Sequence, residues 1–483
     1  MKKQLLLLVM MLLPMAASAD ESGTCGDNLT WTYLASSHKL IITGSGNMTD
    51  YCYLYSYSPT SSRWDWYDRP WESFYADIQN IEILDGVTSI GCAAFRNCTN
   101  LLTITLPQSL CSIGNLSFLN CNLLASIDIP NNVNSIGACS FMQCSSLTTI
   151  SLPNTIVSIK DGTFDNCRSL LSISIPQSVT QIDCGAFNLC DNLVSTILPS
   201  GLTSIGNYAF RYCGSLMSIT IPSALTSIGY EAFQYCSSLS SVYISDLISW
   251  CNINFGGNPL QSAHHLFLND TEIIDLIIPE GSSSIGQNAF IGGTSFKSII
   301  IPNSVTSIGS SAFEGCTGLT SVTIPNSVIS IGSSAFRSCS GLVSVTIPNS
   351  VTAIGERTFE GCSELSSVTL PNSINSIADY TFYDCGKLNN LSIPNTVNKI
   401  GDAAFCRCER LSSIIIPNSV TSIGRDAFGG CKNLKTITLP DELKIIKIFT
   451  FYDCSSLESI TIPSKVEYIY QSVFEGCNSL SNR

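Results

Sequence analysis

Apolar and polar positions along most of this chain follow a pattern that returns every 23 residues. Proline recurs at this step over 107–222 and again over 279–463, and phenylalanine does so over 95–233 and 290–474. One longer proline step, of 57 residues, separates the two series. A fixed period of this length is typical of repeat proteins whose units stack on one another. We therefore predict sixteen coils between residues 78 and 480, interrupted by one insert.

The unit at residues 319–341 illustrates the elements that the spacing predicts. Apolar residues alternate with polar ones ahead of Pro325, as in a strand with one buried face, and the proline ends that strand. A second extended stretch follows at Val328–Ile331. Ala335 or Phe336 is then spaced to share one side of a single helical turn with Cys339. One such coil buries too little apolar surface to fold alone, so each coil must stack on its neighbours.

The unit L-x-S-V-T-I-P-N-S-V-x-S-I-G-x-x-A-F-x-x-C resembles the BspA-type leucine-rich repeat of bacterial surface proteins, a family recognised in Bacteroidetes and treponemes. The insert around Trp250 and the segment around Trp31 and Trp71 also resemble parts of that family. The resemblance implies a β-rich repeat solenoid, a right-handed superhelix or horseshoe of 23-residue coils with parallel strands and short helical turns. It also implies a secreted or surface-exposed binding protein, because adhesion to host matrix proteins or other bacteria is attributed to some members.

The N-terminus has the features of an export signal. Lys2 and Lys3 precede an apolar run that ends at Leu13, and small residues precede Asp20. We predict five segments: a signal peptide at 1–19, an N-terminal β and aromatic capping segment at 20–77, a first block of leucine-rich repeats at 78–245, an irregular insert with a short helix and a hairpin at 246–270, and a second repeat block at 271–483. The last coil has no evident polar cap, so we expect either a further segment or end-to-end self-association there.

Composition narrows the classes of function. The chain is 45% hydrophobic and only 12% charged, which excludes a disordered protein. Its net charge of −13 has the wrong sign for a partner that neutralises phosphates, so we expect no nucleic acid ligand. After the signal peptide, no apolar run approaches the ~20 residues of a membrane span.

Serine and threonine occupy the outward positions of the predicted first strands and supply the polar surface that charge does not. They form a candidate binding face, because the sheet faces of solenoids are often their binding surfaces. The alternative is ordinary solvation of strand positions. The candidates are Thr103, Thr105, Ser218, Thr220, Ser321, Thr323, Ser344, Thr346, Ser367, Thr369, Ser459 and Thr461.

Cysteine is abundant, with 23 residues, and fifteen of them follow the repeated Phe by three positions. An unbroken file of this kind fits small buried thiols, with some ladder disulfides or metal capture as the alternative. The 23-residue spacing lacks the C-x-x-C pairing of zinc sites. In the N-terminal segment, Cys25 and Cys52 are the one plausible disulfide.

Two irregular segments carry candidate contact residues. Trp64, Trp66 and Trp71 lie in an aromatic stretch that also contains Asp65, Asp68 and Glu72, and they could bind a sugar or protein or could instead cap the first coil. In the insert, Trp250, His264 and His265 are candidates for contact or for packing. Near the C-terminus a candidate basic strip, with a salt-bridged surface as its alternative, comprises Arg407, Arg410, Arg425, Lys432 and Lys435.

No catalytic motif emerges from the sequence. His38, His264 and His265 are the only histidines, and the chain has no H-E-x-x-H, G-x-S-x-G or phosphate-loop pattern. We expect no cofactor, no metal and no enzymatic activity. The expected partner is a protein or cell-surface ligand. The alternatives are a glycan-binding or glycan-processing protein that uses the N-terminal aromatic and acidic segment, and a structural spacer without a ligand.

Overall fold

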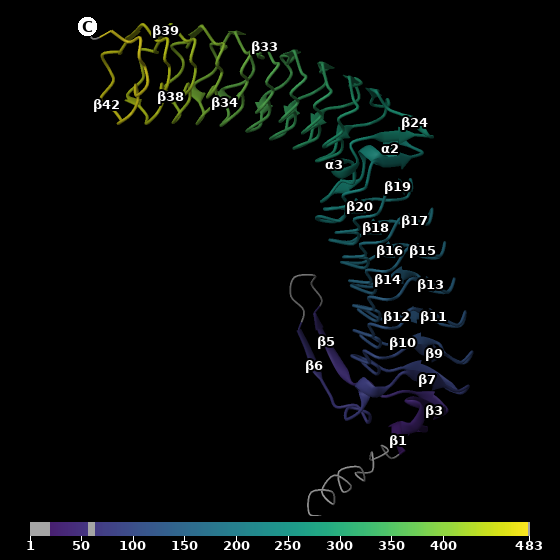
Figure 1. Ribbon diagram of the computed structural model, residues 1–483. Coiled ribbons are helices and arrows are strands. Elements are labelled where there is room, and N and C mark those ends of the chain that lie inside the picture. Colours follow the sequence, from purple (N-terminus) through teal and green to yellow (C-terminus); the bar gives the residue numbers. More distant parts are fainter. Residues whose placement is uncertain (1–19, 57–62, 482–483) are drawn as a thin grey trace, which may run out of the picture. The chain divides into compact units, whose positions relative to one another are not determined.

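The computed structural model describes residues 20–56 and 63–481, so the predicted signal peptide lies outside the described residues (Figure 1). The chain divides into two compact units. Unit 1 runs to Met217 and includes Glu231–Ser238, whereas unit 2 comprises Ser218–Tyr230 and the chain from Leu239 onward. Each unit is a stack of coils built on the 23-residue period.

Each regular coil contributes a first strand of two to four residues, a second strand and a turn. Strand β29 (Ser321–Thr323) pairs in parallel with β27 (Ser298–Ile300), and β30 (Ser330–Ile331) pairs with β28 (Ser307–Ile308). In both ladders the paired residues are 23 positions apart, because the repeat places the same residue at the same point of every coil. The central residue of β29, Val322, is buried between two exposed residues. This confirms the predicted β-rich solenoid of parallel strands.

In unit 1, first strands lie side by side along one flank and second strands along another (Figure 1). The first strands are β7 (Asn80–Ile83), β9 (Thr103–Thr105), β11 (Ser126–Asp128), β13 (Thr149–Ser151), β15 (Ser172–Ser174) and β17 (Ser195–Ile197). The second strands are β8 (Val87–Ile90), β10 (Ser112–Ile113), β12 (Ser135–Ile136), β14 (Ser158–Ile159), β16 (Gln181–Ile182) and β18 (Ser204–Ile205).

Unit 2 continues the same pattern. Its further first strands are β19 (Ser218–Ile221), β21 (Ser241–Ile244), β25 (Asp275–Ile277), β31 (Ser344–Thr346), β33 (Ser367–Thr369), β35 (Asn390–Leu391), β37 (Ser413–Ile415), β39 (Thr436–Thr438) and β41 (Ser459–Thr461). Its further second strands are β20 (Ser227–Ile228), β26 (Ser284–Ile285), β32 (Ala353–Ile354), β34 (Ser376–Ile377), β36 (Lys399–Ile400), β38 (Ser422–Ile423), β40 (Ile445–Ile446) and β42 (Tyr468–Ile469).

The described chain has about seventeen coils rather than the sixteen expected. The difference arises at the insert, because β21 begins a coil whose remainder is irregular. There α2 (Leu247–Cys251) leads into β22 (Asn254–Phe255), which pairs with β20 as a second strand. After α3 (Leu260–Ala263), β23 (Leu266–Leu268) pairs with β21 and forms an antiparallel hairpin with β24 (Thr271–Glu272).

The turn that carries the repeated Phe is not the helical turn that its spacing suggested. In one coil, Ser334 and Ser338 flank Phe336 and have φ angles of 58° and 57°. The amides of Ser334, Phe336 and Ser338 donate to carbonyls of the next coil over 2.7–2.9 Å. These left-handed residues turn alternate N–H groups toward the neighbouring coil and away from a helix axis, so the turns form a third hydrogen-bonded ladder. We call the two positions after each repeated Phe the turn edge.

At the start of unit 1, an antiparallel meander extends the first-strand sheet. It comprises β1 (Glu21–Gly26), β2 (Leu29–Leu34) and β3 (Lys39–Gly44), and β3 pairs in parallel with β7. The remaining elements before the first coil are η1 (Ala35–Ser37), β4 (Gly46–Asn47), β5 (Cys52–Ser56), β6 (Arg63–Trp66) and η2 (Tyr75–Asp77). Strands β5 and β6 form a two-stranded antiparallel hairpin, and β4 pairs with β8.

Candidate binding surfaces

The core of both units is a file of stacked phenylalanines with a file of cysteines beside it. Phe118 and Phe141 stack with ring centroids 5.3 Å apart and planes 6° apart, and the other repeated rings do the same within each unit. Cys144 donates its thiol to the Phe118 carbonyl at 3.2 Å, and the same contact recurs in successive coils. All fifteen register cysteines are free thiols. Fourteen of them are buried and Cys477 is partly exposed, so the prediction of buried thiols rather than ladder disulfides is confirmed for all but the last coil. Burial raises the pKa of Cys144 to about 12, so this thiol stays protonated and inert at neutral pH.

The predicted Cys25–Cys52 disulfide is wrong. Cys52 is bonded to Cys92 of the first coil, and Cys25 is a free, buried thiol. The amide of Tyr51 donates to the Cys92 carbonyl at 2.8 Å, which brings the start of β5 to the turn of that coil. The disulfide therefore ties the β5–β6 hairpin to the stack.

The candidate hydroxyl face lies where the strand pattern places it. Eleven of its twelve side chains are exposed, and Ser367 is half-buried. Their backbone groups are used in the parallel ladders, so the hydroxyls are the chemistry that this face presents to solvent. The first-strand ladder is continuous over β25, β27, β29, β31 and β33, and exposed Ile277 and Ile300 replace a hydroxyl residue on β25 and β27.

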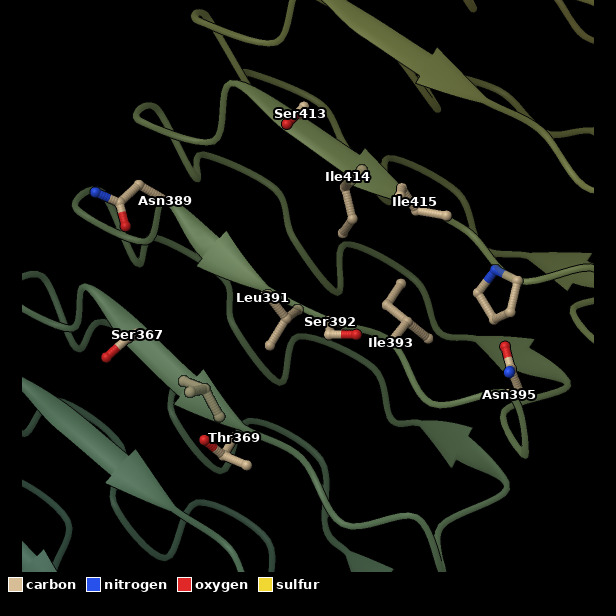
Figure 2. Close-up of a pocket in the computed structure, with 12 residues that line it drawn as sticks. Ser367, Thr369, Asn389, Leu391, Ser392, Ile393, Asn395, Ser413, Ile414 and Ile415 are labelled. Carbon is tan, nitrogen blue, oxygen red and sulfur yellow. The ribbon is translucent and has the colours of Figure 1, made fainter.

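A hollow of about 610 Å³ interrupts this face in unit 2 (Figure 2). Strand β35 has two residues where β33 and β37 have three, and the six-stranded sheet that begins at β25 ends there. Exposed Ser392 lies between Thr369 and Ile415 in Figure 2, and 80% of Ile415 is exposed. The hollow thus combines hydroxyl and amide groups with an apolar side chain in water.

Of the three N-terminal tryptophan candidates, the structure describes the side chain of one. Trp71 is fully buried, stacks on Phe95 at 5.7 Å and donates its indole N–H to the Ala94 carbonyl at 2.8 Å. It therefore caps the first coil and is not available to a ligand. The backbone of Trp64 and Trp66 lies in β6, and their side chains lie outside the described residues.

Glu72 does not have the surroundings of a catalytic acid. Arg69 donates to it at 2.8 Å, and Arg96 lies 3.3 Å away. Burial opposes ionisation, but the hydrogen bond and charge of Arg69 and the charge of Arg96 prevail and hold the pKa of Glu72 below its ordinary value. A general acid needs the opposite shift.

The insert candidates also divide. Trp250 is buried and donates its indole N–H to the Ala289 carbonyl at 2.9 Å, so it packs and makes no surface contact. His264 and His265 are exposed, but they bond to different partners, the Gly292 carbonyl at 2.9 Å and Glu272 at 2.6 Å. The structure does not combine the two imidazoles into one site.

The five bases of the candidate strip are all exposed. Lys432 pairs with Glu409 at 2.7 Å, and this hydrogen bond raises the pKa of Lys432. Arg407 and Lys432 line one hollow together with four carboxylates, whereas Arg425 lines another with Lys447 and Tyr470. The carboxylates beside Arg407 and Lys432 favour the alternative of a salt-bridged surface over a continuous basic strip.

A family model for the BspA type leucine-rich repeat region matches residues 72–183, 157–265, 261–389 and 375–483. The chain belongs to the BspA-type leucine-rich repeat family. No curated protein matches this BspA-type chain.

Solved leucine-rich repeat proteins from several bacteria are similar to it. One from Bacteroides ovatus is 22% identical, with a TM-score of 0.45, over 92% of this chain and 99% of that one. A leucine-rich cell surface protein from Faecalibacterium prausnitzii is 21% identical, with a TM-score of 0.30, over 97% and 95% of the two chains. A repeat protein of T. pallidum is 25% identical, with a TM-score of 0.32, over 42% of this chain and 86% of that one.

Within the described part of this BspA-type chain, no cluster of three or more His, Cys, Asp or Glu side chains could hold a metal ion. No described helix has the length and apolarity needed to cross a membrane. Leucine-rich repeat families are generally non-catalytic.

The sequence reasoning missed the turn edge as a surface. In unit 1, Arg211 lies over the rings of Tyr208, Tyr212 and Tyr235, and it pairs with Glu231 at 3.2 Å. Tyr212 and Tyr235 stack at 4.6 Å. Aligning the coils on their Phe would have shown this signal, because the turn-edge positions differ between coils while the hydroxyl face repeats.

Proposed function

We propose that this protein is an exported, non-catalytic binding protein that attaches to a protein or cell-surface ligand through its hydroxyl face. The observation that carries the proposal is the hollow at β33, β35 and β37, where a repetitive polar face acquires a shaped, mixed-polarity depression. A recess of this kind can exclude water around a partner side chain, which a flat hydroxyl surface cannot do. Family membership supports a role in protein interaction or adhesion.

The proposed export rests on the N-terminal signal pattern of residues 1–19. Export in turn supports a role at the cell surface. Disulfide Cys52–Cys92 fits an oxidising compartment. The proposed partner is a host matrix protein or another cell, and the binding screen described next distinguishes these two.

The test is a binding screen of the chain from residue 20 against immobilised host matrix proteins and intact bacterial cells. We expect saturable binding to one of them, and we expect Ser392→Arg to weaken it by about tenfold, because the arginine fills the hollow. Ser174→Arg, at the same register position of exposed strand β15, is the matched control and should bind normally. Absence of binding to every surface, or equal binding by both variants, would refute the proposal.

The alternative of a glycan-processing enzyme at the N-terminus has less support. Trp71 is buried, and Glu72 is held ionised between two arginines. Neither can act on a sugar in the way that the aromatic and acidic composition suggested.

A further inference from the structure

One coil of unit 2 has two glycines on its turn edge where the coils on both sides carry side chains. The pairs at these two positions, in consecutive coils, are Tyr383–Asp384, Cys406–Arg407, Gly429–Gly430 and Tyr452–Asp453. The result is a hollow of about 500 Å³ with its floor at the two glycines. We call this hollow the glycine slot.

Planar groups form the walls of the slot. On one side, the Arg407 guanidinium lies over the Tyr383 ring at 5.8 Å. On the other side, 41% of Tyr452 is exposed, and its ring is held by Phe449 at 5.4 Å and an interplanar angle of 81°. The equivalent edge of unit 1 shows what occupies such a position when side chains are present, because Tyr212 and Tyr235 stack there at 4.6 Å. At the glycine slot this position carries no side chain, which leaves room beside Tyr452 for the ring of an external ligand.

The two glycines differ in what a side chain would meet. A Cβ on Gly429 would lie 1.8 Å from Asp426 Oδ1, so only glycine lets this carboxylate fold over the turn. Gly430 has a φ of 72°, a left-handed conformation that glycine adopts without strain. A Cβ there would lie 3.4 Å from Arg407 Cγ and would begin to fill the slot.

The rim of the slot is rich in hydrogen-bonding groups. Asp384, Glu409, Asp426 and Asp453 supply carboxylate acceptors, and Arg407 and Lys432 supply donors. Asp426 is partly buried and accepts from Cys406 Sγ at 3.4 Å. Four acids against two bases leave an excess of negative charge, which repels an anionic ligand.

We propose that the glycine slot binds a neutral hexopyranose residue of a glycan. Its ring fits between Tyr452 and Arg407, with its C–H face against the aromatic ring. Its hydroxyls donate to the carboxylates and accept from Arg407 and Lys432. A sugar acid is excluded by the surplus of carboxylates, and an aliphatic ligand would leave the rim groups unpaired.

The probes are methyl α-D-mannopyranoside, methyl β-D-galactopyranoside and methyl β-D-glucopyranoside, examined by saturation-transfer NMR with the whole chain. We expect saturable transfer to at least one of them and none to methyl glucuronate. Gly430→Asn should reduce the transfer about tenfold. Asparagine is tolerated at this register position, since Asn97, Asn120 and Asn166 occupy it with φ of 58–62°. Gly315→Asn, at the same register position with φ of 74°, is the matched control and should bind as the wild type does.

Transfer to none of the three hexosides, equal transfer in Gly430→Asn, or stronger transfer to the uronate would each overturn the proposal. A circular dichroism melt of each variant excludes a folding defect. The result is separable from the adhesion assay, because Ser392→Arg lies on the strand face and leaves the slot intact. Loss of sugar binding with normal cell attachment would be a failure of this inference alone.

Discussion

The N-terminal cap and the insert solve the same structural problem with different chemistry. In regular coils the carbonyl of the Ala before the repeated Phe accepts from the Phe amide of the preceding coil, as Ala312 does from Phe290 at 2.8 Å. Ala94 and Ala289 have no such preceding Phe. Trp71 and Trp250 supply the missing donor through their indole N–H groups, at 2.8 and 2.9 Å.

The two regions differ in the groups that support the tryptophan. In the cap, Arg69 also donates to the Ala94 carbonyl at 3.4 Å and is paired with Glu72. In the insert, Asn258 donates to the Ala289 carbonyl at 2.9 Å without a charge. The cap is additionally bonded through Cys52 and Cys92. Where the turn ladder is interrupted, the free alanine carbonyl needs a hydrogen-bond donor, and either a neutral or an ionic side chain can provide it.

The largest expected effect comes from removing the tryptophans. Trp71→Ala and Trp250→Ala should each lower local stability by about 3–5 kcal/mol, because a buried ring and its hydrogen bond are lost together. Hydrogen exchange measured by mass spectrometry should show the loss around β7–β9 for the first variant and around β25–β27 for the second. Leu171→Ala, at a half-exposed apolar residue, is the control and should change little. Unchanged exchange in either tryptophan variant would contradict the shared role.

Removal of the disulfide should affect the stability of the N-terminal cap but not that of the insert. Cys52→Ser with Cys92→Ser should destabilise the cap by about 2–4 kcal/mol and leave the insert unaffected. The same exchange experiment measures both. In the native wild type, thiol titration should label exposed Cys111 first, and after denaturation without reductant it should count the 21 free cysteines. A count of 23 would mean that the pair is not formed.

A smaller effect should follow from removing only the indole N–H. Trp71→Phe and Trp250→Phe keep an aromatic ring, and Arg69 or Asn258 still donates to the carbonyl. We expect a loss of about 1 kcal/mol at each position in chemical denaturation. Combining Trp250→Phe with Asn258→Leu should cost more than the sum of the single changes, since the carbonyl is then left without a donor. Simple additivity would argue against this explanation.

The smallest effect should be the response to acid. The pKa of Glu72 is below its ordinary value of 4.5, so its stabilising contribution is complete above that pH and is lost as the pH falls through the lowered pKa. In the insert, hydrogen bonds from Ser249 hold the pKa of Asp246, which caps α2, below normal in the same way. The protection factors, which are corrected for the fall of the intrinsic exchange rate with pH, should therefore decrease between pH 6 and pH 3 in both regions. Glu72→Gln should remove this acid response at the cap only, and Asp246→Asn at the insert only.

The period of the sequence predicts the strands, their register and the file of buried thiols, because every coil repeats the same apolar positions. It predicts the hydroxyl face for the same reason. It does not predict the partner of Cys52, since that depends on which coil the β5–β6 hairpin reaches. The left-handed turns were also missed, because residues such as Leu116 and Tyr380 adopt a positive φ only where the neighbouring coil accepts their hydrogen bonds.

The candidate binding surfaces likewise include features that the repeat predicts and features that it does not. The alternation of polar and apolar residues is enough to place Ser321 or Thr323 on the hydroxyl face. The hollow at Ser392 arises from a shortened strand, and no single residue of the sequence predicts that shortening. The glycine slot exists only because Gly429 and Gly430 stack between larger neighbours. Features that depend on differences between coils, rather than on their shared pattern, become visible only when the coils are compared with one another position by position.

Recognition through the hydroxyl face is tested most directly by hydrogen exchange of the chain in complex with whichever matrix protein or cell-surface component it binds. Recognition through the hydroxyl face predicts slower exchange at β33, β35 and β37, which line the hollow around Ser392. Protection confined to the turn edge or to β1–β6, with unchanged exchange at these three strands, would contradict it.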